Sequence, residues 1–301
     1  MSDAVIKTKE EVPGSTIFLR RLRHRITSTA VRNPVVWWRH RNLQPADIML
    51  ASYPRSGSTW LRFTLFEILT GESSSFDKVN AALRGISDYK YGRPVLPGGG
   101  RFIGTHESYR KEYPKTVYLV RDARDVALSE FAFEKNLGIG RASMEDYLRD
   151  MLLLGKRHGS WPNHVNSWLN SPLAQSGRLL LVKYEDLRKN SEDVLDEILN
   201  FLGVKVRAEA IRTAVANNTV QRMQEKEDKM YRQDDYAAVP RRPQLGVEKG
   251  GRFVRAGAVG GWHERLTHAQ LEMFDKYAGE TLAKLGYPAS VVASEELAHT
   301  V

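Results

Sequence analysis

The residues best suited to chemistry stand together in the segment Tyr53-Pro54-Arg55-Ser56-Gly57-Ser58-Thr59-Trp60. A glycine lets the backbone approach an oxyanion closely, and hydroxyl residues at a helix start add side-chain and backbone donors. The helix start also carries partial positive charge, and Arg55 adds a permanent cation. The segment therefore predicts a phosphate cradle. The lysine of the nucleoside-triphosphate loop does not follow Gly57, so the ATP or GTP version of the cradle is not matched.

Two further segments place arginines where an oxyanion can bind. Arg121 directly follows an apolar run, at the expected carboxyl end of a buried strand, which is where open α/β sheets bind ligands. Ser129 lies on the helix expected next and can face the same way. Arg255 and Gly257 belong to a glycine-broken loop, in which a guanidinium and backbone amides can surround one phosphate.

One histidine stands at a position suited to catalysis. His106 follows Gly104-Thr105 at the end of a short predicted strand. An imidazole that titrates near neutrality is matched to removing the proton of a weak nucleophile such as a hydroxyl. A hydrogen-bonded structural histidine is the alternative for His106. The other histidines stand in no motif, and we expect surface or core roles for them.

Hydrophobic patterning predicts strands that alternate with helices. Short apolar runs indicate buried strands, and apolar residues at helical spacing indicate helices. Residues 72–100 are expected to be irregular, and residues 231–261 to form a long functional loop. The strands are predicted at 48–51, 102–105, 116–120 and 179–184, and the helices at 59–69 (ended by Gly71), from about 124, at 144–157 and 161–169, from an N-cap at Ser191 to Gly203, at 207–230 and at 266–285.

This alternation predicts the α/β class. We expect a single three-layer domain, with a central, mainly parallel sheet, a P-loop-like binding loop after the first strand, and helices on both faces. The predicted boundaries are a basic N-terminal extension at residues 1–45, the main domain at residues 46–288 and a C-terminal tail at residues 289–301.

The composition narrows the classes of function. The chain has 301 residues, a net charge of +9 and no cysteine, which excludes disulfides, thiolate metal sites and cysteine nucleophiles. The positive charge indicates either an anionic partner (nucleic acid, a membrane surface or a polyanionic small molecule) or simple basic solubility. No apolar stretch approaches the roughly 20 residues that span a bilayer, and no signal peptide is evident. We therefore expect a cytoplasmic protein.

The N-terminal extension is the most basic part of the chain. Between residues 17 and 41 its arginines are interleaved with aliphatic and aromatic residues, and no acid is among them. Such a segment can lie on an anionic membrane or on RNA, or can be a helix that wraps the main domain with its arginines in solvent. The sequence leaves these alternatives open.

Taken together and in this order, the three arginine-bearing segments strongly resemble the cytosolic sulfotransferase family. The first is similar to its 5′-phosphosulfate loop, the second to its 3′-phosphate segment and the third to its Arg-Lys-Gly-x-x-Gly-Asp-Trp signature. A fourth match is Val182-Lys183-Tyr184-Glu185-Asp186-Leu187, which resembles a Tyr-Glu-Asp element near the adenine. The resemblance covers residues 46–288 and implies 3′-phosphoadenosine 5′-phosphosulfate (PAPS) as donor, adenosine 3′,5′-bisphosphate (PAP) as product and no metal.

The resemblance also implies roles for individual residues. Residues 55–59 would hold the 5′-phosphosulfate, Trp60 and Tyr184 would lie near the adenine, and His106 would be the catalytic base. Arg55 takes the place of the lysine that stabilises the leaving group. The implied donor site comprises Arg55, Ser56, Gly57, Ser58, Thr59, Trp60, Arg121, Ser129, Tyr184, Thr219, Arg255, Ala256 and Gly257, and the implied catalytic residues are His106 and Arg55.

Several positions depart from the family pattern. Gly104 replaces a lysine that precedes the histidine, so one cation near the sulfuryl group is missing or is supplied elsewhere. Ala256 replaces the lysine of the last signature, and Gly261 its aspartate. Asn218-Thr219-Val220 only loosely matches the family's Thr-Ser-Phe element. These changes indicate a distant, bacterial-type member.

The predicted function is sulfuryl transfer to a hydroxyl or amine of a small-molecule, lipid or carbohydrate acceptor. Peripheral membrane contact through the N-terminal extension stays open, and no nucleic acid is expected as a partner. Two alternatives remain. An ATP-dependent kinase with a P-loop-like fold would need Mg²⁺ and ignore a 3′-phosphate, and a non-catalytic nucleic-acid-binding or membrane-binding protein would act through residues 1–45.

Overall fold

A computed structural model gives the fold of the chain. It describes residues 34, 37, 38, 40–136, 143–155, 158–232, 253–255 and 257–290. The chain divides into two compact units, Met1–Arg39 and His40–Val301, and the elements described below belong to the second. Within the described residues, no helix is long and apolar enough to cross a membrane.

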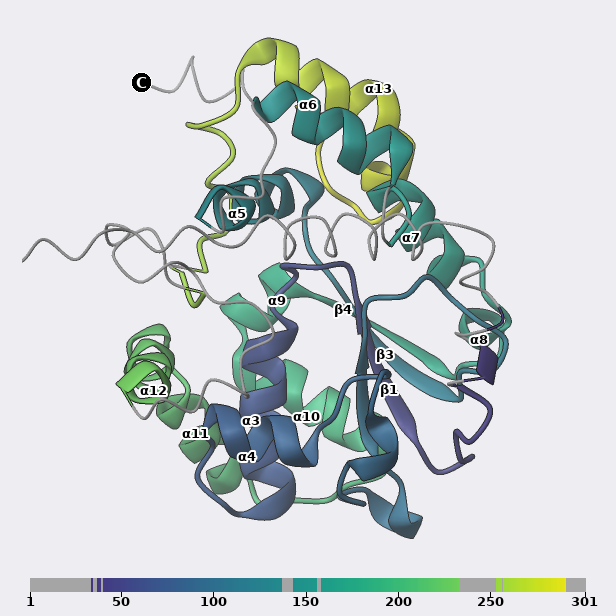
Figure 1. Ribbon diagram of the computed structural model, residues 1–301, viewed down its shortest axis with the longest axis vertical. Coiled ribbons are helices and arrows are strands. Elements are labelled where there is room, and N and C mark those ends of the chain that lie inside the picture. Colours follow the sequence, from purple (N-terminus) through teal and green to yellow (C-terminus); the bar gives the residue numbers. More distant parts are fainter. Residues whose placement is uncertain are drawn as a thin grey trace, which may run out of the picture. The chain divides into compact units, whose positions relative to one another are not determined.

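A four-stranded parallel sheet forms the centre of the second unit (Figure 1). Its order is β2 (Phe102–Thr105), β1 (Ile48–Ser52), β3 (Lys115–Val120) and β4 (Leu179–Lys183). The register pairs Ala51 with Thr105 on one side and with Tyr118 on the other, so the three carboxyl ends lie side by side. All four predicted strands are confirmed, except that Tyr184 opens a helix instead of ending β4.

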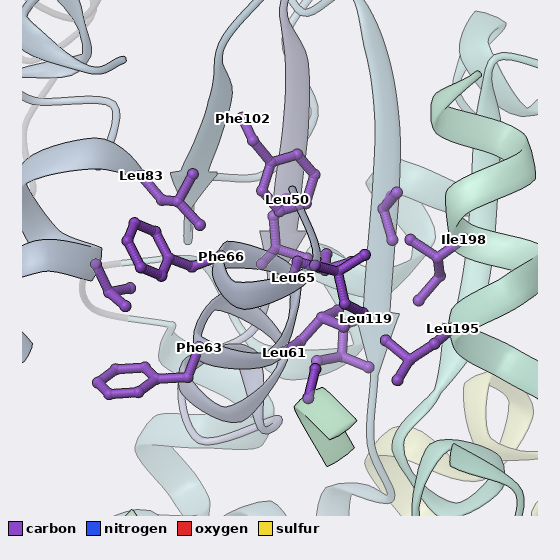
Figure 2. Close-up of a cluster of buried hydrophobic side chains, with 14 of the residues drawn as sticks. Leu50, Leu61, Phe63, Leu65, Phe66, Leu83, Phe102, Leu119, Leu195 and Ile198 are labelled. Carbon is purple, nitrogen blue, oxygen red and sulfur yellow. The ribbon is translucent and has the colours of Figure 1, made fainter. Parts of the chain in front are cut away.

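One face of the sheet packs against an aliphatic and aromatic core. Leu50 and Leu119 point from the sheet toward Leu61 and Leu65 of the helix that follows β1, and Ile198 closes the cluster (Figure 2). These side chains are buried because alternate residues of a strand, and residues three or four apart on a helix, share one face. The helices packed around this core are α3 (Ser58–Thr70), α4 (Phe76–Ala82), α9 (Tyr184–Lys189), α10 (Ser191–Leu202), α11 (Ala208–Asn217) and α12 (Val220–Arg232).

The opposite face carries a second core, rich in aromatic rings. Tyr118 of β3 stacks on Trp168 with ring centroids 5.4 Å apart, and Trp168 stacks on Tyr113 at 5.5 Å. Helices therefore cover both faces, and the predicted three-layer α/β fold is confirmed. The elements on this face are α5 (Ala123–Asn136), α6 (Met144–Arg149), η3 (Asp150–Leu154), α7 (Trp161–Leu169), α8 (Pro172–Gln175) and α13 (His268–Lys284). Two short 3₁₀ helices, η1 (Tyr89–Tyr91) and η2 (Pro97–Gly99), complete the described elements.

Four further sequence predictions of element boundaries are wrong. Residues 144–157 do not form one α-helix, because α6 passes into the π-helical turn η3, which Gly155 ends at φ 58°. Residues 207–230 break at Asn218, whose side chain turns back to the carbonyl of Ala214 at 2.8 Å. Ser191 is the first residue of α10 and not its cap, since its hydroxyl donates to Leu187 O at 2.8 Å. Residues 72–100, expected to be irregular, contain α4.

Candidate active site

The loop between β1 and α3 approaches its neighbours too closely for any residue except glycine at position 57. Gly57 has a φ of 96°, and a Cβ there would lie 2.5 Å from the ring of Tyr184. The hydroxyl of Ser56 is buried in this loop and has no hydrogen-bond partner among the described residues. Buried polar atoms normally have partners, so an orphaned one at a helix start fits an anionic ligand.

Arg55 reaches from this loop across to two other segments. It is the non-glycine residue with positive φ (66°) in the part of the chain that the structure describes. Its Nε donates to Ser129 Oγ at 3.2 Å and its Nη2 to Phe253 O at 3.0 Å. The rings of Phe133 and Phe253 lie 4.6 and 4.9 Å from its guanidinium. Burial lowers the pKa of Arg55, although a guanidinium stays charged at physiological pH.

Arg121 ties the same loop to the third segment. At the carboxyl end of β3, it donates to Arg55 O at 3.1 Å and to Ala258 O at 2.7 Å. Its guanidinium lies 4.5 Å from the ring centroid of Tyr184. Its Nε is buried without a partner among the described residues, which again leaves a donor for an anion.

Arg255 adds a further cation to this corner. Burial lowers its pKa, and the positive charges of Arg265 and Arg121 lower it further. Mutually repelling guanidiniums are stabilised by an anion that pairs with several of them at once. Beside it, Gly257 adopts φ 61° and accepts a hydrogen bond from Tyr184 OH at 3.0 Å. Ala256 lies outside the described residues.

His106 follows β2 at the same edge of the sheet. Its Nδ1 lies 2.8 Å from Ser52 O, and the Ser52 hydroxyl lies 3.3 Å from the same nitrogen. A carbonyl only accepts, so Nδ1 carries the proton and Nε2 is the basic nitrogen. The ring of His158 stands edge-on to it with centroids 5.8 Å apart. Beneath this pair, His164 is fully buried, and burial lowers its pKa to about 3.

The position of Gly104 is next to a different cation. The Cδ of Arg62, from α3, lies 4.0 Å from the place that a Cβ on Gly104 would take. Arg62 donates to Asn80 Oδ1 at 3.2 Å and to the carbonyl of Leu83. Burial lowers the pKa of Arg62 to about 10, so it remains protonated at neutral pH.

Comparison with known proteins identifies the family. Residues 45–286 match the family described as "Sulfotransferase domain". The chain belongs to the sulfotransferase family. The predicted family, fold class and enzyme class are thereby confirmed.

Curated relatives agree with this assignment. The chain is 28% identical over 263 residues to the 3-beta-hydroxysteroid sulfotransferase of Cavia porcellus, covering 83% of this chain and 88% of that protein. It is 27% identical over 256 residues to sulfotransferase 2A1 of Homo sapiens, covering 81% and 86%.

Solved structures share the fold. Retinol dehydratase in complex with retinol and PAP has a TM-score of 0.62 at 20% identity, covering 80% of this chain and 82% of that one. Mouse sulfotransferase SULT7A1 complexed with PAP has a TM-score of 0.58 at 21% identity, covering 86% and 90%. At these identities, the likeness supports the fold of this sulfotransferase and nothing finer.

The sulfotransferase structure brings most of the predicted residues together. Arg55, Arg121 and Ser129 interlock directly, and Tyr184 packs against Gly57 and Gly257. Two other residues predicted for the donor site, Trp60 and Thr219, form their hydrogen bonds at the break between α11 and α12. Trp60 donates from Nε1 to Asn218 O at 2.7 Å, and Thr219 Oγ1 accepts from the backbone of Arg222 at 3.3 Å.

Sequence reasoning missed three polar residues of this site. Asp125 accepts a hydrogen bond from Gly260 N at 2.8 Å, and burial raises its pKa. His158 faces His106 from a loop without a motif. Glu227, fully buried, holds the backbone that leads into Arg255. A signal for Glu227 exists, because it shares the apolar helical face of Met223 and Met230 at spacings of four and three.

Proposed function

We propose that this sulfotransferase moves a sulfuryl group from PAPS to a hydroxyl of a small-molecule acceptor, with His106 as general base. The observation that carries the proposal is the hydrogen bond from His106 Nδ1 to Ser52 O at 2.8 Å, which leaves Nε2 to accept the proton. His106 stands at the carboxyl edge of the sheet with the phosphate-cradle loop, where acceptor and donor have to meet.

The donor site divides into two anion-binding parts. Residues 55–59 and the start of α3 supply guanidinium, hydroxyl and amide donors for the 5′-phosphosulfate. Arg121, Ser129, Arg255 and Gly257 surround the proposed 3′-phosphate. The orphaned Ser56 Oγ and Arg121 Nε, together with the crowded guanidiniums, fit a ligand that carries phosphates at both ends.

The reaction follows an in-line displacement at sulfur. The acceptor oxygen forms the new bond to sulfur while the bond from sulfur to the bridging oxygen of the phosphosulfate breaks. His106 Nε2 takes the acceptor proton, and PAP leaves with the electron pair. Arg55 stabilises the charge that develops on the leaving oxygen, so catalysis depends mainly on position and electrostatics.

The acceptor class is inferred from relatives. A curated relative is named for a 3-beta-hydroxysteroid, and a structural neighbour is complexed with retinol. Both molecules are apolar alcohols, and we infer an apolar alcohol of similar size here. Lipid and carbohydrate acceptors, a cytoplasmic location and contact with membranes through residues 1–45 stay predictions from the sequence.

Nucleotide selectivity is the first test. We expect PAP at about 100 times its dissociation constant to stabilise the protein by about 2.7 kcal/mol, seen as a shift of several degrees in Tm. Equal concentrations of 5′-AMP and of ATP with Mg²⁺ are the comparisons. A shift with ATP–Mg²⁺ alone would favour the kinase alternative and contradict the proposal.

The base is tested separately with His106→Ala. We expect turnover of PAPS with a 3β-hydroxysteroid or retinol as acceptor to fall about 10²- to 10⁴-fold, while PAP still binds, because a general base contributes about that much. His268→Ala, on the exposed first turn of α13, is the matched control. Turnover of His106→Ala at the wild-type rate would exclude His106 as the base.

A further inference from the structure

Glu227 holds the chain immediately before the third arginine segment. Its side chain is fully buried on α12, between Met223 and Met230 on the same helical face. Its two carboxylate oxygens accept from the backbone N–H of Phe253 at 2.7 Å and of Val254 at 2.9 Å. One carboxylate thus fixes two successive peptide groups that lie far from it in the sequence.

Those two peptide groups support two arginines of the donor site. Phe253 O accepts from Arg55 Nη2 at 3.0 Å, and the Phe253 ring lies 4.9 Å from the same guanidinium. Val254 directly precedes Arg255, whose Nη1 reaches Leu128 O at 3.5 Å. Any shift of the backbone at Phe253 and Val254 therefore moves the partner of Arg55 and the start of Arg255 together.

A carboxylate is the group that suits this place. A buried charge is tolerated only when it is hydrogen-bonded, and hydrogen bonds to a charged acceptor are shorter and stronger than neutral ones. The charge also acts on the site itself. Burial lowers the pKa of Arg55, and the negative charges of Glu130 and Glu227 oppose that effect. An amide in place of the carboxylate would turn a donor toward one of the two N–H groups.

We propose that Glu227 is a positioning residue of the donor site: it fixes the backbone at Phe253 and Val254 so that Arg55 and Arg255 converge on the two anionic ends of PAPS. The inference rests on the proposed function, because it assigns Arg55 and Arg255 to the donor. Glu227 itself touches neither substrate.

The test compares Glu227→Gln with Glu225→Gln. Glu225 is an exposed residue of the same helix that pairs with Arg222 at 3.7 Å, so the control removes the same charge. We expect Glu227→Gln to raise the KM for PAPS and the Kd for PAP about tenfold, with the acceptor KM unchanged and the Kd for 5′-AMP raised less. The control stays at wild-type values. If Glu227 served stability alone, Glu227→Gln would lower Tm without weakening donor binding selectively over acceptor binding.

A double-mutant cycle sharpens the result. Because Glu227 acts in part through Arg255, we expect Glu227→Gln to weaken PAP binding less in the Arg255→Ala variant than in the wild type, since coupled residues are non-additive. Fully additive losses would overturn the inference.

A second variant applies if Glu227→Gln does not fold. The amide of Gln224 donates to Val254 O at 3.3 Å, so it holds the same backbone, and we expect Gln224→Ala to raise the Kd for PAP about threefold. Unchanged PAP affinity in Gln224→Ala would then overturn the inference.

Failure of the inference and failure of the proposed function are distinguishable in the wild-type protein. A wild type that binds PAP no better than 5′-AMP contradicts the proposed function. If the wild type binds PAP better than 5′-AMP, and Glu227→Gln shows the same preference and the same KM for PAPS, only the role of Glu227 is contradicted.

Discussion

The proton on Nδ1 of His106 determines which nitrogen of that ring is basic. Ser52 O accepts a hydrogen bond from this N–H, and Ser52 is the last residue of β1, so the strand that precedes the predicted phosphate cradle also orients the proposed base. Behind His106, His164 lies 3.0 Å by its Nδ1 from the hydroxyl of Tyr118. Burial and the neighbouring His106 lower the pKa of His164 to about 3, so its imidazole is neutral in the folded protein.

This buried imidazole predicts a specific loss of stability in acid. In the unfolded chain His164 has an ordinary pKa of 6.5, and in the folded protein about 3. Between these values only the unfolded state binds the proton, so folding stability falls as pH drops below 6.5 and is unaffected above it. From pH 7 to pH 5 we expect the free energy of unfolding to fall about 2 kcal/mol more in the wild type than in His164→Gln. Urea denaturation at both pH values measures the difference.

The matched control is His268→Gln, which removes an exposed imidazole from α13. We expect it to follow the wild-type dependence on pH. If the free energy of unfolding depended on pH equally in the wild type and in His164→Gln, His164 would take up a proton as readily in the folded protein as in the unfolded chain. That outcome would contradict the effect of burial on this residue.

At the residue scale, the sequence predicted the groups that stand in motifs and missed those that support them. Arg55, Arg121 and His106 each follow a strand, and their residue type and position make them recognisable in the sequence. Glu227 is not, because its partners lie 26 and 27 residues further along the chain, and only the fold brings α12 beside residues 253 and 254. His158, which stands in the sequence between η3 and α7, likewise meets His106 only in the folded chain.

At the scale of elements, both ends of α3 are glycines with positive φ, but their surroundings differ. Gly57 begins the helix at φ 96°, and the Tyr184 ring lies 2.5 Å from the place that a methyl group there would take. Gly71 ends the helix at φ 71°, with nothing within 4 Å of the same position. An alanine in the left-handed region costs about 1–2 kcal/mol by itself. Gly71→Ala therefore isolates the conformational cost, and Gly57→Ala adds the clash.

We expect Gly71→Ala to lower the free energy of unfolding by about 1 kcal/mol and to leave PAP binding intact. Gly57→Ala should cost clearly more, since Tyr184 is itself held by Arg121 and by Gly257 O, and it should weaken PAP binding at least tenfold. Urea denaturation and titration calorimetry measure the two effects. Equal behaviour of the two variants would show that Tyr184 moves aside freely.

Strands were easier to predict than helix limits, and the reason is physical. Apolar runs such as residues 116–120 are buried on both faces, which leaves a strong pattern. The helix ends at Gly71 and Gly203 follow from the glycines themselves, but other helix limits depend on contacts that no local pattern reveals. The break between α11 and α12 is stabilised by Asn218, whose side chain also accepts from Lys226 at 2.8 Å and from Ser74 at 3.1 Å. Such a network is visible only after folding.

At the scale of the whole molecule, the first residues of the second unit pack against that unit's own core. The ring of His40 lies 5.2 Å from that of Tyr113, and Leu43 packs against the aromatic core. Asp47, just before β1, accepts from Arg101 Nε at 3.0 Å and from Gln44 N at 2.8 Å. Residues 40–47 thus belong to the packing of the main unit, and a truncation that preserves them should remove residues 1–39.

We expect the chain without residues 1–39 to fold and to bind PAP within about twofold of the full chain, because each described contact of the proposed donor site lies within His40–Val301. The same truncation removes most arginines of the basic extension. If that extension binds anionic surfaces, cosedimentation with phosphatidylserine vesicles falls in the truncated chain while PAP binding stays. Circular dichroism confirms folding and calorimetry gives the Kd. A folded truncated chain that no longer binds PAP would place part of the donor site in residues 1–39 and contradict a site built only from the main unit.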